Sequence, residues 1–488
     1  MSISTTPTTY LNYLSRLLVI IDLFPMEINN LFALANFAQI EQESQKEFNS
    51  FWNLGQEQFL SRMEKKIAQL EASTSQDKYI IAYAFCIKMD EKIIYVNDNN
   101  PNKMSISSLI SIKPNRPTIQ RCPLNPNYKD TLIEIHPKFG VYDIIEKGEE
   151  TKSRGLSNKD AFTGINGLLK KISYTTHSPK FQVTDIILDF PDSFTGDSLT
   201  IGFSPMTNQD IIKFGNKQTV VNGLSFDVSS SSIKEKKEEF LEKRLENMWI
   251  KASELNTDIV FFPEMLGVKT WEVIENSYHS SVKSAFEKVI ELGFSPPKLT
   301  FLPSFCENNS NSISIVYQDG QALGKQNKQR PFIDRTNHKM EAVAPAETQT
   351  IIVIHIPGVH RIAIMICSDY LTCSLDMQKK LFADLGITLL LVPSYSRGEQ
   401  DFINKLPELK KYGTSVVWGN CCAATKPKRI IGGCSIAALD DLHRFKDYAR
   451  CDNNCKKSCL FLVKIPMHIK RDLREKVKLD NIISQELL

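Results

Sequence analysis

The spacing of apolar residues predicts a helical beginning and a change to short strands further along the chain. From Tyr10 to about Ala72 apolar residues recur at helical spacing, and Gly55 is the only glycine. This pattern predicts two or three helices. Residues 79–83 and 93–95 are short β-rich runs on either side of the charged segment 89–92, a pattern typical of a hairpin.

The next segment is rich in Asn and Pro and is expected to be largely loop. It covers residues 98–130 and is followed by strand-like runs at 131–135 and 184–190. We therefore interpret residues 1–195 as a smaller mixed α+β domain. This region lacks grouped Cys, His, Asp and Glu at metal or nucleophile spacing, so we expect it to control substrate access or to bind a partner.

From Ser198 the chain alternates apolar strands with amphipathic helices, which is typical of a layered α/β domain. A charged helix with the apolar stripe Phe240, Leu241, Leu245, Met248, Ala252 and Leu255 follows the first strand, 198–204. The pattern predicts a four-layer α-β-β-α sandwich over 196–470 and a tail over 471–488. Further strands are expected at 257–262, 299–302, 312–317, 351–356, 362–366, 388–392, 415–418, 435–438 and 460–465, and helices at 270–292, 376–385 and 399–411.

Three of these segments end in groups that could carry chemistry. Glu264 follows the strand 259–262, Lys328 follows Gly324, and Cys367 closes the apolar run 362–366. Each alone has an ordinary explanation, because such a carboxylate is usually a cap, such a lysine is solvated and such a cysteine belongs to the core. The three together indicate a nucleophilic site.

The ordered set of motifs around these residues resembles the nitrilase, or carbon–nitrogen hydrolase, superfamily. The resemblance spans residues 198 to about 470, somewhat over half of the chain. It rests on the segments Asp258–Glu264, Asn311–Gly320, Leu323–Lys325, Lys328–Phe332, Glu341, Pro357–Gly358, Ile362–Asp369, Asn420 and Gly432–Ile436.

The resemblance implies a catalytic triad of Glu264, Lys328 and Cys367, with Glu341 as a second glutamate. Glu264 would accept the proton of the Cys367 thiol, and Lys328 would favour the thiolate and stabilise the oxyanion. The backbone N–H of Ser368 would be the second oxyanion donor, and Glu341 would orient Lys328 and water. The implied reaction is hydrolysis of a small non-peptide amide through a thioester, with no metal or organic cofactor.

Departures from the family pattern indicate an unusual substrate pocket. Ser368 stands where many members carry an aromatic or acidic residue, Leu371–Cys373 replaces the common arginine and proline, and Arg330–Pro331 replaces a frequent histidine–leucine pair. Nitrile hydrolysis is disfavoured, because the aromatic residue that commonly follows the nucleophile in nitrilases is absent. Nitrilase-like domains joined to accessory regions occur in bacterial defence proteins, and this arrangement is similar.

Net charge and cysteine content restrict the expected substrates and the expected cellular compartment. The 488 residues contain 59 basic and 56 acidic side chains, so the net charge of +3 does not indicate nucleic acid as a substrate. The early apolar stretch 17–24 contains Asp22 and is too short to span a membrane. Eleven cysteines cannot all be paired in disulfides. We expect a cytoplasmic protein with reduced thiols and no membrane partner.

Other sites fit the sequence less well. Cys451, Cys455 and Cys459 lack the paired spacing of structural zinc sites and have no second pair. A cysteine–histidine protease would need His355 or His360 beside Cys367, but both lie on the preceding strand and turn, where structural roles are expected.

The alternative to an enzyme is a catalytically silent nitrilase-like scaffold or sensor that binds a protein or nucleic-acid partner. Its partner would dock on residues 1–195. For either function we expect a symmetric dimer that pairs through the helices at 376–385 and 399–411, with the tail 470–488 reaching a neighbour.

Overall fold

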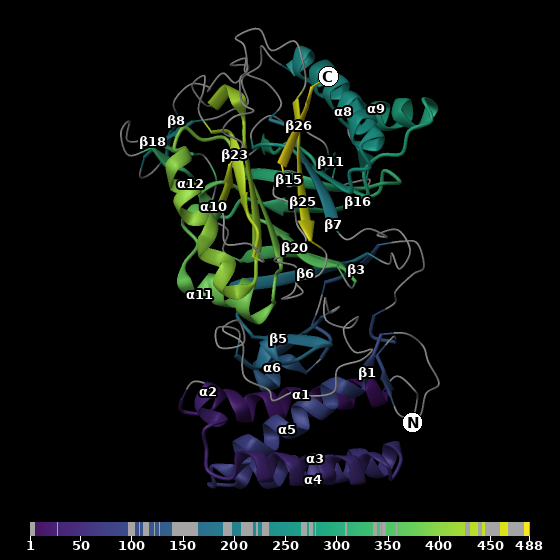
Figure 1. Cartoon of the computed structure of the whole chain (residues 1–488), viewed down its shortest axis with the longest axis vertical. Helices are drawn as coiled ribbons and strands as arrows, with labels where there is room; N and C mark the ends of the chain where they lie inside the picture. The colour runs from purple at the N-terminus through teal and green to yellow at the C-terminus, as the bar shows by residue number, and fades with distance from the viewer. Residues whose placement is uncertain are drawn as a thin grey trace. The chain divides into compact units, whose positions relative to one another are not determined.

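A computed structural model of the chain divides it into two compact units (Figure 1). Unit 1 comprises residues 1–191, 353–361 and 375–387, and unit 2 comprises residues 192–352, 362–374 and 388–488. The structure describes residues 5–26, 28–95, 103–106, 108–110, 117–121, 123–125, 127–138, 164–188, 198–205, 218–220, 223–226, 234–264, 271–272, 277–278, 280–307, 310–334, 339–341, 343, 348–357, 359–424, 430–437, 442–444, 459–466 and 483–487.

Unit 1 begins with long helices that enclose an apolar core. They are α1 (Thr5–Asp22), α3 (Phe37–Trp52), α4 (Gln56–Ala72) and α5 (Asp77–Lys92), with the short α2 (Ile28–Leu31) between α1 and α3. Tyr10, Phe48, Phe59 and Phe85 are buried in this core. Tyr10 donates a hydrogen bond from its hydroxyl to the Met89 carbonyl, 2.8 Å away, which fastens α1 to α5.

The predicted strand at 79–83 is wrong, because these residues belong to α5. Nearly every residue from Ile80 to Ile87 is buried or partly buried, so this helix has no polar face that would reveal a period of 3.6. A short run of buried aromatic and β-branched residues looks the same in a strand and in a fully buried helix. The second predicted run is a strand, β1 (Ile93–Ile94), which pairs with β2 (Met104–Ser105) rather than forming a hairpin.

The strands of unit 1 carry a buried chain of histidines and carboxylates. β4 (Ile133–Pro137) pairs with β5 (Ile172–Thr176), and β3 (Thr118–Gln120) pairs with β6 (Phe181–Ile187). The side chains of His177, Glu134, His136, Asp185 and His355 contact one another in that order, and we call them the His–carboxylate chain. His355 lies on β19 (Gln349–Ile356), at the part that belongs to unit 1. Short elements of unit 1 are α6 (Tyr128–Thr131), η1 (Gly164–Gly167), α11 (Leu375–Gln378) and the π-helical η2 (Lys379–Asp384).

Unit 2 contains two large sheets. The first has the strand order β14-β15-β13-β10-β7-β25-β26, and β16 also pairs with β15. The second contains β24, β23, β22, β21 and β20 in that order. The bounds are β7 (Ser198–Phe203), β10 (Ile259–Phe261), β13 (Leu299–Phe301), β14 (Phe305–Glu307), β15 (Ser310–Tyr317), β16 (Ala322–Asn327), β20 (His360–Ile364), β21 (Leu389–Ser394), β22 (Ser415–Asn420), β23 (Gly432–Ser435), β24 (Leu442–Arg444), β25 (Cys459–Pro466) and β26 (Ile483–Leu487).

The two sheets of unit 2 pack face to face, with helices on their outer faces. Successive residues of a strand point to opposite faces, and β22 uses this alternation. Gly419 faces the first sheet, where a Cβ atom would lie 2.3 Å from the ring of Phe203, so only glycine allows this approach. The preceding residue, Trp418, stacks on Phe402 with ring centroids 5.0 Å apart. Phe402 belongs to α12 (Glu399–Lys405), which continues as the 3-10 helix η3 (Leu406–Tyr412).

On the other side, α8 (Lys234–Glu254) and α9 (Ser280–Glu291) lie side by side against the first sheet (Figure 1). Leu245 and Met248 of α8, Val289 of α9 and Val260 of β10 share one buried cluster. The predicted four-layer α-β-β-α fold is therefore confirmed. The predicted helix 270–292 begins too early, because α9 starts at Ser280 after the small β11 (Trp271–Glu272) and β12 (Ser277–Tyr278) ribbon.

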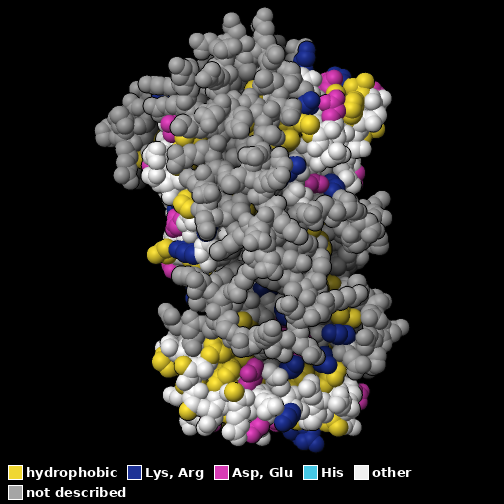
Figure 2. All heavy atoms as spheres, viewed as in Figure 1, with side chains coloured by type: hydrophobic (Ala, Val, Ile, Leu, Met, Phe, Trp, Pro, Cys, Tyr) yellow, Lys and Arg dark blue, Asp and Glu magenta, His cyan; other side chains and the backbone are white. Residues whose placement is uncertain are grey.

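A small four-stranded sheet completes the described part of unit 2, with the order β17-β18-β9-β8. Its strands are β17 (Ile333–Asp334), β18 (Lys339–Glu341), β9 (Gly223–Phe226) and β8 (Gln218–Val220), and η4 (Cys422–Ala424) follows β22. On the surface of the unit 1 helices, Lys, Arg, Asp and Glu side chains mix with apolar ones (Figure 2). Among the described helices, none has the combination of length and apolar character needed to cross a membrane.

Candidate active site

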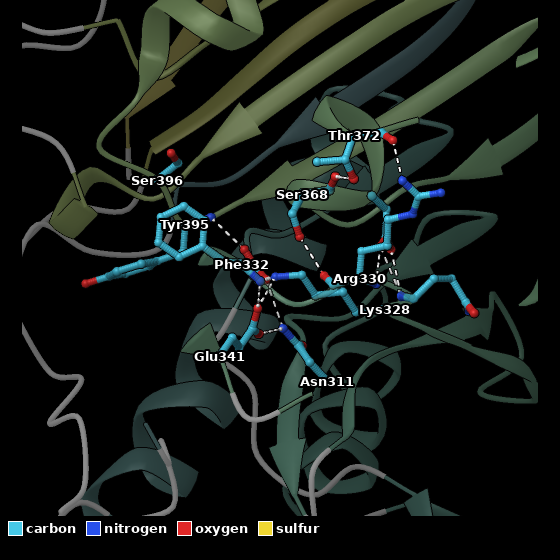
Figure 3. Close-up of polar contacts among 12 residues, drawn as sticks. Asn311, Lys328, Arg330, Phe332, Glu341, Ser368, Thr372, Tyr395 and Ser396 are labelled. Carbon is cyan, nitrogen blue, oxygen red and sulfur yellow. Dashed lines mark hydrogen bonds and ion pairs between the residues drawn. The ribbon is translucent and has the colours of Figure 1, made fainter. Parts of the chain in front are cut away.

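Four polar side chains from separate elements of unit 2 meet in its interior. Glu264 lies just after β10. Lys328 lies just after β16, Glu341 ends β18, and Asn311 is in β15 (Figure 3). The side chains of Glu264 and Glu341 are at most 3% exposed and that of Lys328 is fully buried. A buried charge is costly unless it is paired and hydrogen-bonded. The pairing within this cluster therefore decides whether it is stable.

The ammonium of Lys328 bridges the two carboxylates. Its Nζ donates to Glu264 Oε1 at 2.6 Å and to Glu341 Oε2 at 2.5 Å. The side-chain amide of Asn311 repeats this bridge, because its Nδ2 donates to Glu264 Oε1 at 2.9 Å and to Glu341 Oε1 at 3.0 Å. One cation and one neutral amide thus hold two buried carboxylates together.

Backbone groups hold the remaining carboxylate oxygens. The N–H of Tyr395 donates to Glu264 Oε2 at 3.1 Å, and the N–H of Phe332 donates to Glu341 Oε2 at 2.9 Å. The N–H of Lys328 itself donates to the Asn311 carbonyl at 2.7 Å. These bonds fix the carboxylates before any substrate is present, which is the preorganisation that a catalytic site needs.

Cys367 lies at the turn between β20 and the short helix α10 (Ser368–Leu371). Its backbone has φ of 50° and ψ of −103°, a left-handed value that L-residues with a Cβ rarely adopt. Such strain persists only where neighbouring contacts impose it, and it is common at functional sites. Cys367 is 3% exposed, and its thiol lies close enough to Glu264, Lys328 and Glu341 for their charges to act on it.

Burial and local charge decide the protonation of this site. Burial raises the pKa of Glu264, although the attraction of Lys328 opposes the shift. Burial alone would lower the pKa of Lys328, but the attraction of Glu264 and Glu341 outweighs it, so its pKa is raised well above the usual value. Burial and Glu264 raise the pKa of the Cys367 thiol well above its usual value, although Lys328 opposes them.

The resting site therefore holds a neutral thiol and a protonated lysine. The sequence suggests that Lys328 favours the thiolate, and its charge does act in that direction. Two carboxylates face this single ammonium, however, so the thiol keeps its proton until a base removes it. Among the charged groups that act on the thiol, Glu264 contributes most to the raised pKa.

The structure thus brings together Glu264, Lys328, Glu341 and Cys367, while their catalytic roles stay predictions. Ser368 is the first residue of α10, and its hydroxyl donates to the Arg330 carbonyl at 2.6 Å (Figure 3). The role of its N–H as an oxyanion donor also stays a prediction. Sequence reasoning assigned no role to Asn311 or Asp369, although both lie inside the motifs that carry the resemblance.

The weaker candidate sites gain no support from the described residues. In that part of the chain no group of His, Cys, Asp or Glu could hold a metal ion. Cys451 and Cys455 lie outside the described residues, and Cys459 is a buried residue at the start of β25. His355 contacts Asp185 in unit 1, in agreement with a structural role, and His360 is buried in β20.

Comparison with known proteins gives matches among solved structures only. No protein-family model matches the chain, and no curated protein matches it. A nitrilase-superfamily amidase from Nesterenkonia AN1, in mutant form, is 15% identical over 56% of this chain and 92% of its own, with a TM-score of 0.36. The glutamine-dependent NAD+ synthetase from Acinetobacter baumannii is 17% identical over 55% of this chain and 46% of its own, with a TM-score of 0.34.

A second glutamine-dependent NAD+ synthetase, from Cytophaga hutchinsonii, is 14% identical over 56% of this chain and 43% of its own, with a TM-score of 0.30. Of these three matches, the Nesterenkonia amidase is the one described as a member of the nitrilase superfamily. At this level of identity and structural overlap, conclusions about chemistry rest on the geometry of the site in this chain.

Proposed function

We propose that this protein is a cysteine-dependent hydrolase that cuts a non-peptide carbon–nitrogen bond of a small amide. The observation that carries this proposal is the buried Cys367 thiol on a strained turn, whose pKa is raised by the charge of a buried glutamate that also binds a buried lysine. Cysteine is a weak nucleophile while protonated and needs a base within hydrogen-bonding reach. Glu264 supplies that base, and Lys328 supplies a fixed positive charge beside the reacting atoms.

In the first half of the reaction the thiol attacks the amide carbonyl. The S–H proton moves to Glu264 while the S–C bond forms and the carbonyl π electrons move to oxygen. Lys328 and the N–H of Ser368 stabilise this oxyanion. The intermediate then collapses, the C–N bond breaks, and Glu264 returns its proton to the leaving nitrogen. Ammonia or an amine leaves, and a thioester remains on Cys367.

Water completes the cycle through the same carboxylate. Glu264 removes a proton from water as the water oxygen attacks the thioester carbonyl. The second tetrahedral intermediate breaks its C–S bond, and the sulfur regains the proton from Glu264. Glu341 and Asn311 keep Lys328 and Glu264 in place throughout, because each of them bonds to a member of the triad.

A silent scaffold has no use for this arrangement. Two carboxylates and one ammonium are buried, and burying them costs more free energy than an apolar cluster of equal volume. The pKa values of Glu264 and Cys367 are both raised, so their surroundings disfavour the charged forms. Such shifts are typical of catalytic sites. This favours hydrolysis over the scaffold or sensor alternative.

The test is the reactivity of Cys367 toward amides. Iodoacetamide, an amide that alkylates thiols, is added to the full-length protein, and peptide mass spectrometry follows Cys367. The matched control is Cys373, a buried cysteine whose pKa is also raised, to about 11, by burial. We expect alkylation of Cys367 to exceed that of Cys373 and to fall in Glu264→Gln and Lys328→Met.

Turnover is then sought by ammonia release from small aliphatic and aromatic amides. An acyl adduct in acid-quenched wild-type protein that persists in Cys373→Ala and disappears in Cys367→Ala supports the thioester. Equal labelling of the two cysteines, independent of Glu264, would leave the scaffold as the better account.

The proposal also covers the oligomeric state, the partner and the location of the enzyme. We propose a homodimer that pairs through α12 and η3, with residues 1–195 binding a protein partner or controlling access, in a bacterial defence or regulatory system. A cytoplasmic location suits the free thiols of the described cysteines. Light scattering at micromolar concentration tests the dimer, and a strict monomer would contradict it.

A further inference from the structure

The segment that carries Lys328 is tied to the turn that carries Cys367 by one buried carboxylate. The N–H of Gln329 donates to Asp369 Oδ1 and Oδ2 at 3.0 and 3.1 Å. The N–H of Arg330 donates to Asp369 Oδ1 at 2.8 Å. In the reverse direction, Ser368 donates its hydroxyl hydrogen to the Arg330 carbonyl at 2.6 Å (Figure 3).

We propose that Asp369 is a positioning residue that locks the Lys328 segment to the nucleophile turn through its bonds to the backbone N–H groups of Gln329 and Arg330. The inference rests on the proposed function, because it concerns the same site. Asp369 acts through its neighbours, since its carboxylate binds backbone groups of residues 329 and 330.

The hydrogen bonds of Asp369 connect the segment that carries Lys328 with the turn that carries Cys367. Lys328 and Cys367 come from different sheets, so the distance between ammonium and sulfur depends on contacts between the chain segments after each strand. Residues 328–330 follow β16 directly, and the N–H of Lys328 is fixed to the Asn311 carbonyl. Asp369 fixes the next two residues. Together these bonds give the lysine a defined position relative to the strained turn.

Ionised Asp369 costs folding free energy, which argues against a purely structural role. Burial raises its pKa from 3.8 to about 7, although Lys328 and the N–H groups of Gln329 and Arg330 oppose the shift. Because the folded pKa exceeds the unfolded one, the folded protein favours the protonated form. Its stability therefore falls as the pH rises from about 4 towards 7 and the carboxyl ionises. The carboxylate is present at neutral pH in spite of this cost.

The charged neighbours of Asp369 support a transition close to neutral pH. Lys328 stabilises the carboxylate, and Glu264 opposes it. The thiol of Cys373 also interacts with Asp369, but its own pKa of about 11 keeps it neutral in this range. The raised pKa means that the buried, closed arrangement binds this proton more tightly than an exposed carboxyl does, so a lower pH does not open the lock and the test has to remove the carboxylate itself.

Asp369→Asn tests the lock in the full-length protein, because asparagine keeps the shape but has one acceptor oxygen and no charge. The first readout is hydrogen exchange of the Gln329 and Arg330 N–H groups, corrected for the intrinsic pH dependence of exchange. We expect their protection to fall by roughly 10-fold to 100-fold, the equivalent of one hydrogen bond to a charged group. In wild type the same protection should not fall as the pH drops below 7, because the folded protein binds the Asp369 proton more tightly than the unfolded chain does.

The second readout is the rate of Cys367 alkylation by iodoacetamide from pH 5.5 to pH 8.5. We expect a fall on the order of 100-fold at pH 8, the loss that a misplacement of about 1 Å brings, and no loss of thermal stability. Ser368→Ala should slow the reaction less. The matched control is Asp319→Asn, since Asp319 also accepts a backbone N–H, from Gln321 at 2.8 Å, but lies in an exposed turn. It should change neither readout.

The outcomes of these experiments distinguish a failure of the Asp369 lock from a failure of the proposed hydrolase. Weaker protection in Asp369→Asn, together with wild-type alkylation that is independent of Glu264, supports the lock and contradicts the proposed hydrolase. Unchanged protection and an unchanged alkylation rate in Asp369→Asn overturn the lock and leave the proposed hydrolase intact. If that variant does not fold, Asp369→Glu takes its place, because it keeps the charge but moves the carboxylate, and unchanged protection of the Gln329 and Arg330 N–H groups in it overturns the lock.

Discussion

Two buried charge clusters, one in each unit, use the same chemical groups in opposite ways. In the His–carboxylate chain of unit 1, Asp185 Oδ1 lies 2.7 Å from His355 Nε2, and Asp185 Oδ2 lies 3.2 Å from His136 Nδ1. Glu134 contacts both His136 and His177. Carboxylates and imidazoles alternate, so neither carboxylate has the other as its immediate neighbour.

The pKa shifts of this chain are those of mutually stabilising groups. Burial opposes ionisation of Asp185, but His136 and His355 outweigh it and lower its pKa to about 2. Burial likewise lowers the pKa of His136, but Asp185 and Glu134 outweigh it and raise the value to about 9. Glu134, His136 and Asp185 are thus held in the charged forms that their neighbours favour, and they stabilise unit 1 at neutral pH, whereas burial lowers the pKa of His355.

The cluster around Cys367 shows the opposite pattern. The pKa values of Glu264 and of the Cys367 thiol are both raised by burial, because two carboxylates and a thiol share one ammonium. Opposite shifts in two equally buried clusters therefore distinguish a stabilising network from a reactive one. Burial of charge alone would not separate them.

The largest effect that tests this distinction is expected for Glu264→Gln. Removing the base should slow alkylation of Cys367 and any turnover by about 10²- to 10⁴-fold, the usual contribution of a general base. Stability should fall by about 1–3 kcal/mol, because the Glu264 carboxylate accepts hydrogen bonds from Lys328, Asn311 and Tyr395, while Lys328 keeps Glu341 as its partner. Rates come from mass spectrometry and stability from urea unfolding.

Glu134→Gln is the matched control, because it makes the same change in the other cluster. It should leave the alkylation rate nearly unchanged and weaken the strands of unit 1. A slow, unstable Glu264→Gln variant alongside a slow Glu134→Gln variant would remove the distinction between the clusters.

Asp185→Asn should have the next largest effect, on stability alone. The variant leaves the buried, protonated His136 without its nearest anion and sets an amide N–H₂ against one of the two imidazoles. Breaking a buried ion pair by removing one partner costs about 3–5 kcal/mol. Hydrogen exchange in β4, β5 and β6 should report this loss, while peptides of β10 and β15 should keep their protection. A stable variant with altered Cys367 reactivity would assign the chain a role in catalysis.

Sequence patterns predict the layered fold of unit 2 well, because its elements alternate clearly between buried strands and amphipathic helices. The ends of β10, β16 and β20 were sufficient to bring forward Glu264, Lys328 and Cys367 as a group. Spacing does not reveal Asn311 as a bridge, since it lies within a strand far along the chain from both glutamates. Nor does it reveal Asp369, whose partners are backbone groups and carry no side-chain signature.

Unit 1 was harder to predict for two physical reasons. Helix α5 is buried on nearly all sides, so its apolar run resembles a strand. Contacting members of the His–carboxylate chain are separated by up to 170 residues along the sequence, as between Asp185 and His355, so no local spacing indicates them. The expectation that this region lacks grouped His, Asp and Glu holds along the sequence but not in space.

The smallest predicted effect is the pH dependence of local stability, and the direction of this change can be checked directly. The raised pKa of His136 stabilises unit 1 fully below the unfolded value of 6.5, and this contribution is lost as the pH rises through about 9. Protection of β4 and β5 should therefore fall by about 1 kcal/mol per pH unit above pH 6.5. At the Asp369 turn the loss of stability should occur at lower pH, from about 4 to 7, because that carboxyl has a raised pKa of its own. Hydrogen exchange between pH 5 and 9 resolves both units in one experiment. Since the two contributions fall in adjacent pH windows, a single shared transition would show that the clusters are not independent, and the contrast between them would have to be abandoned.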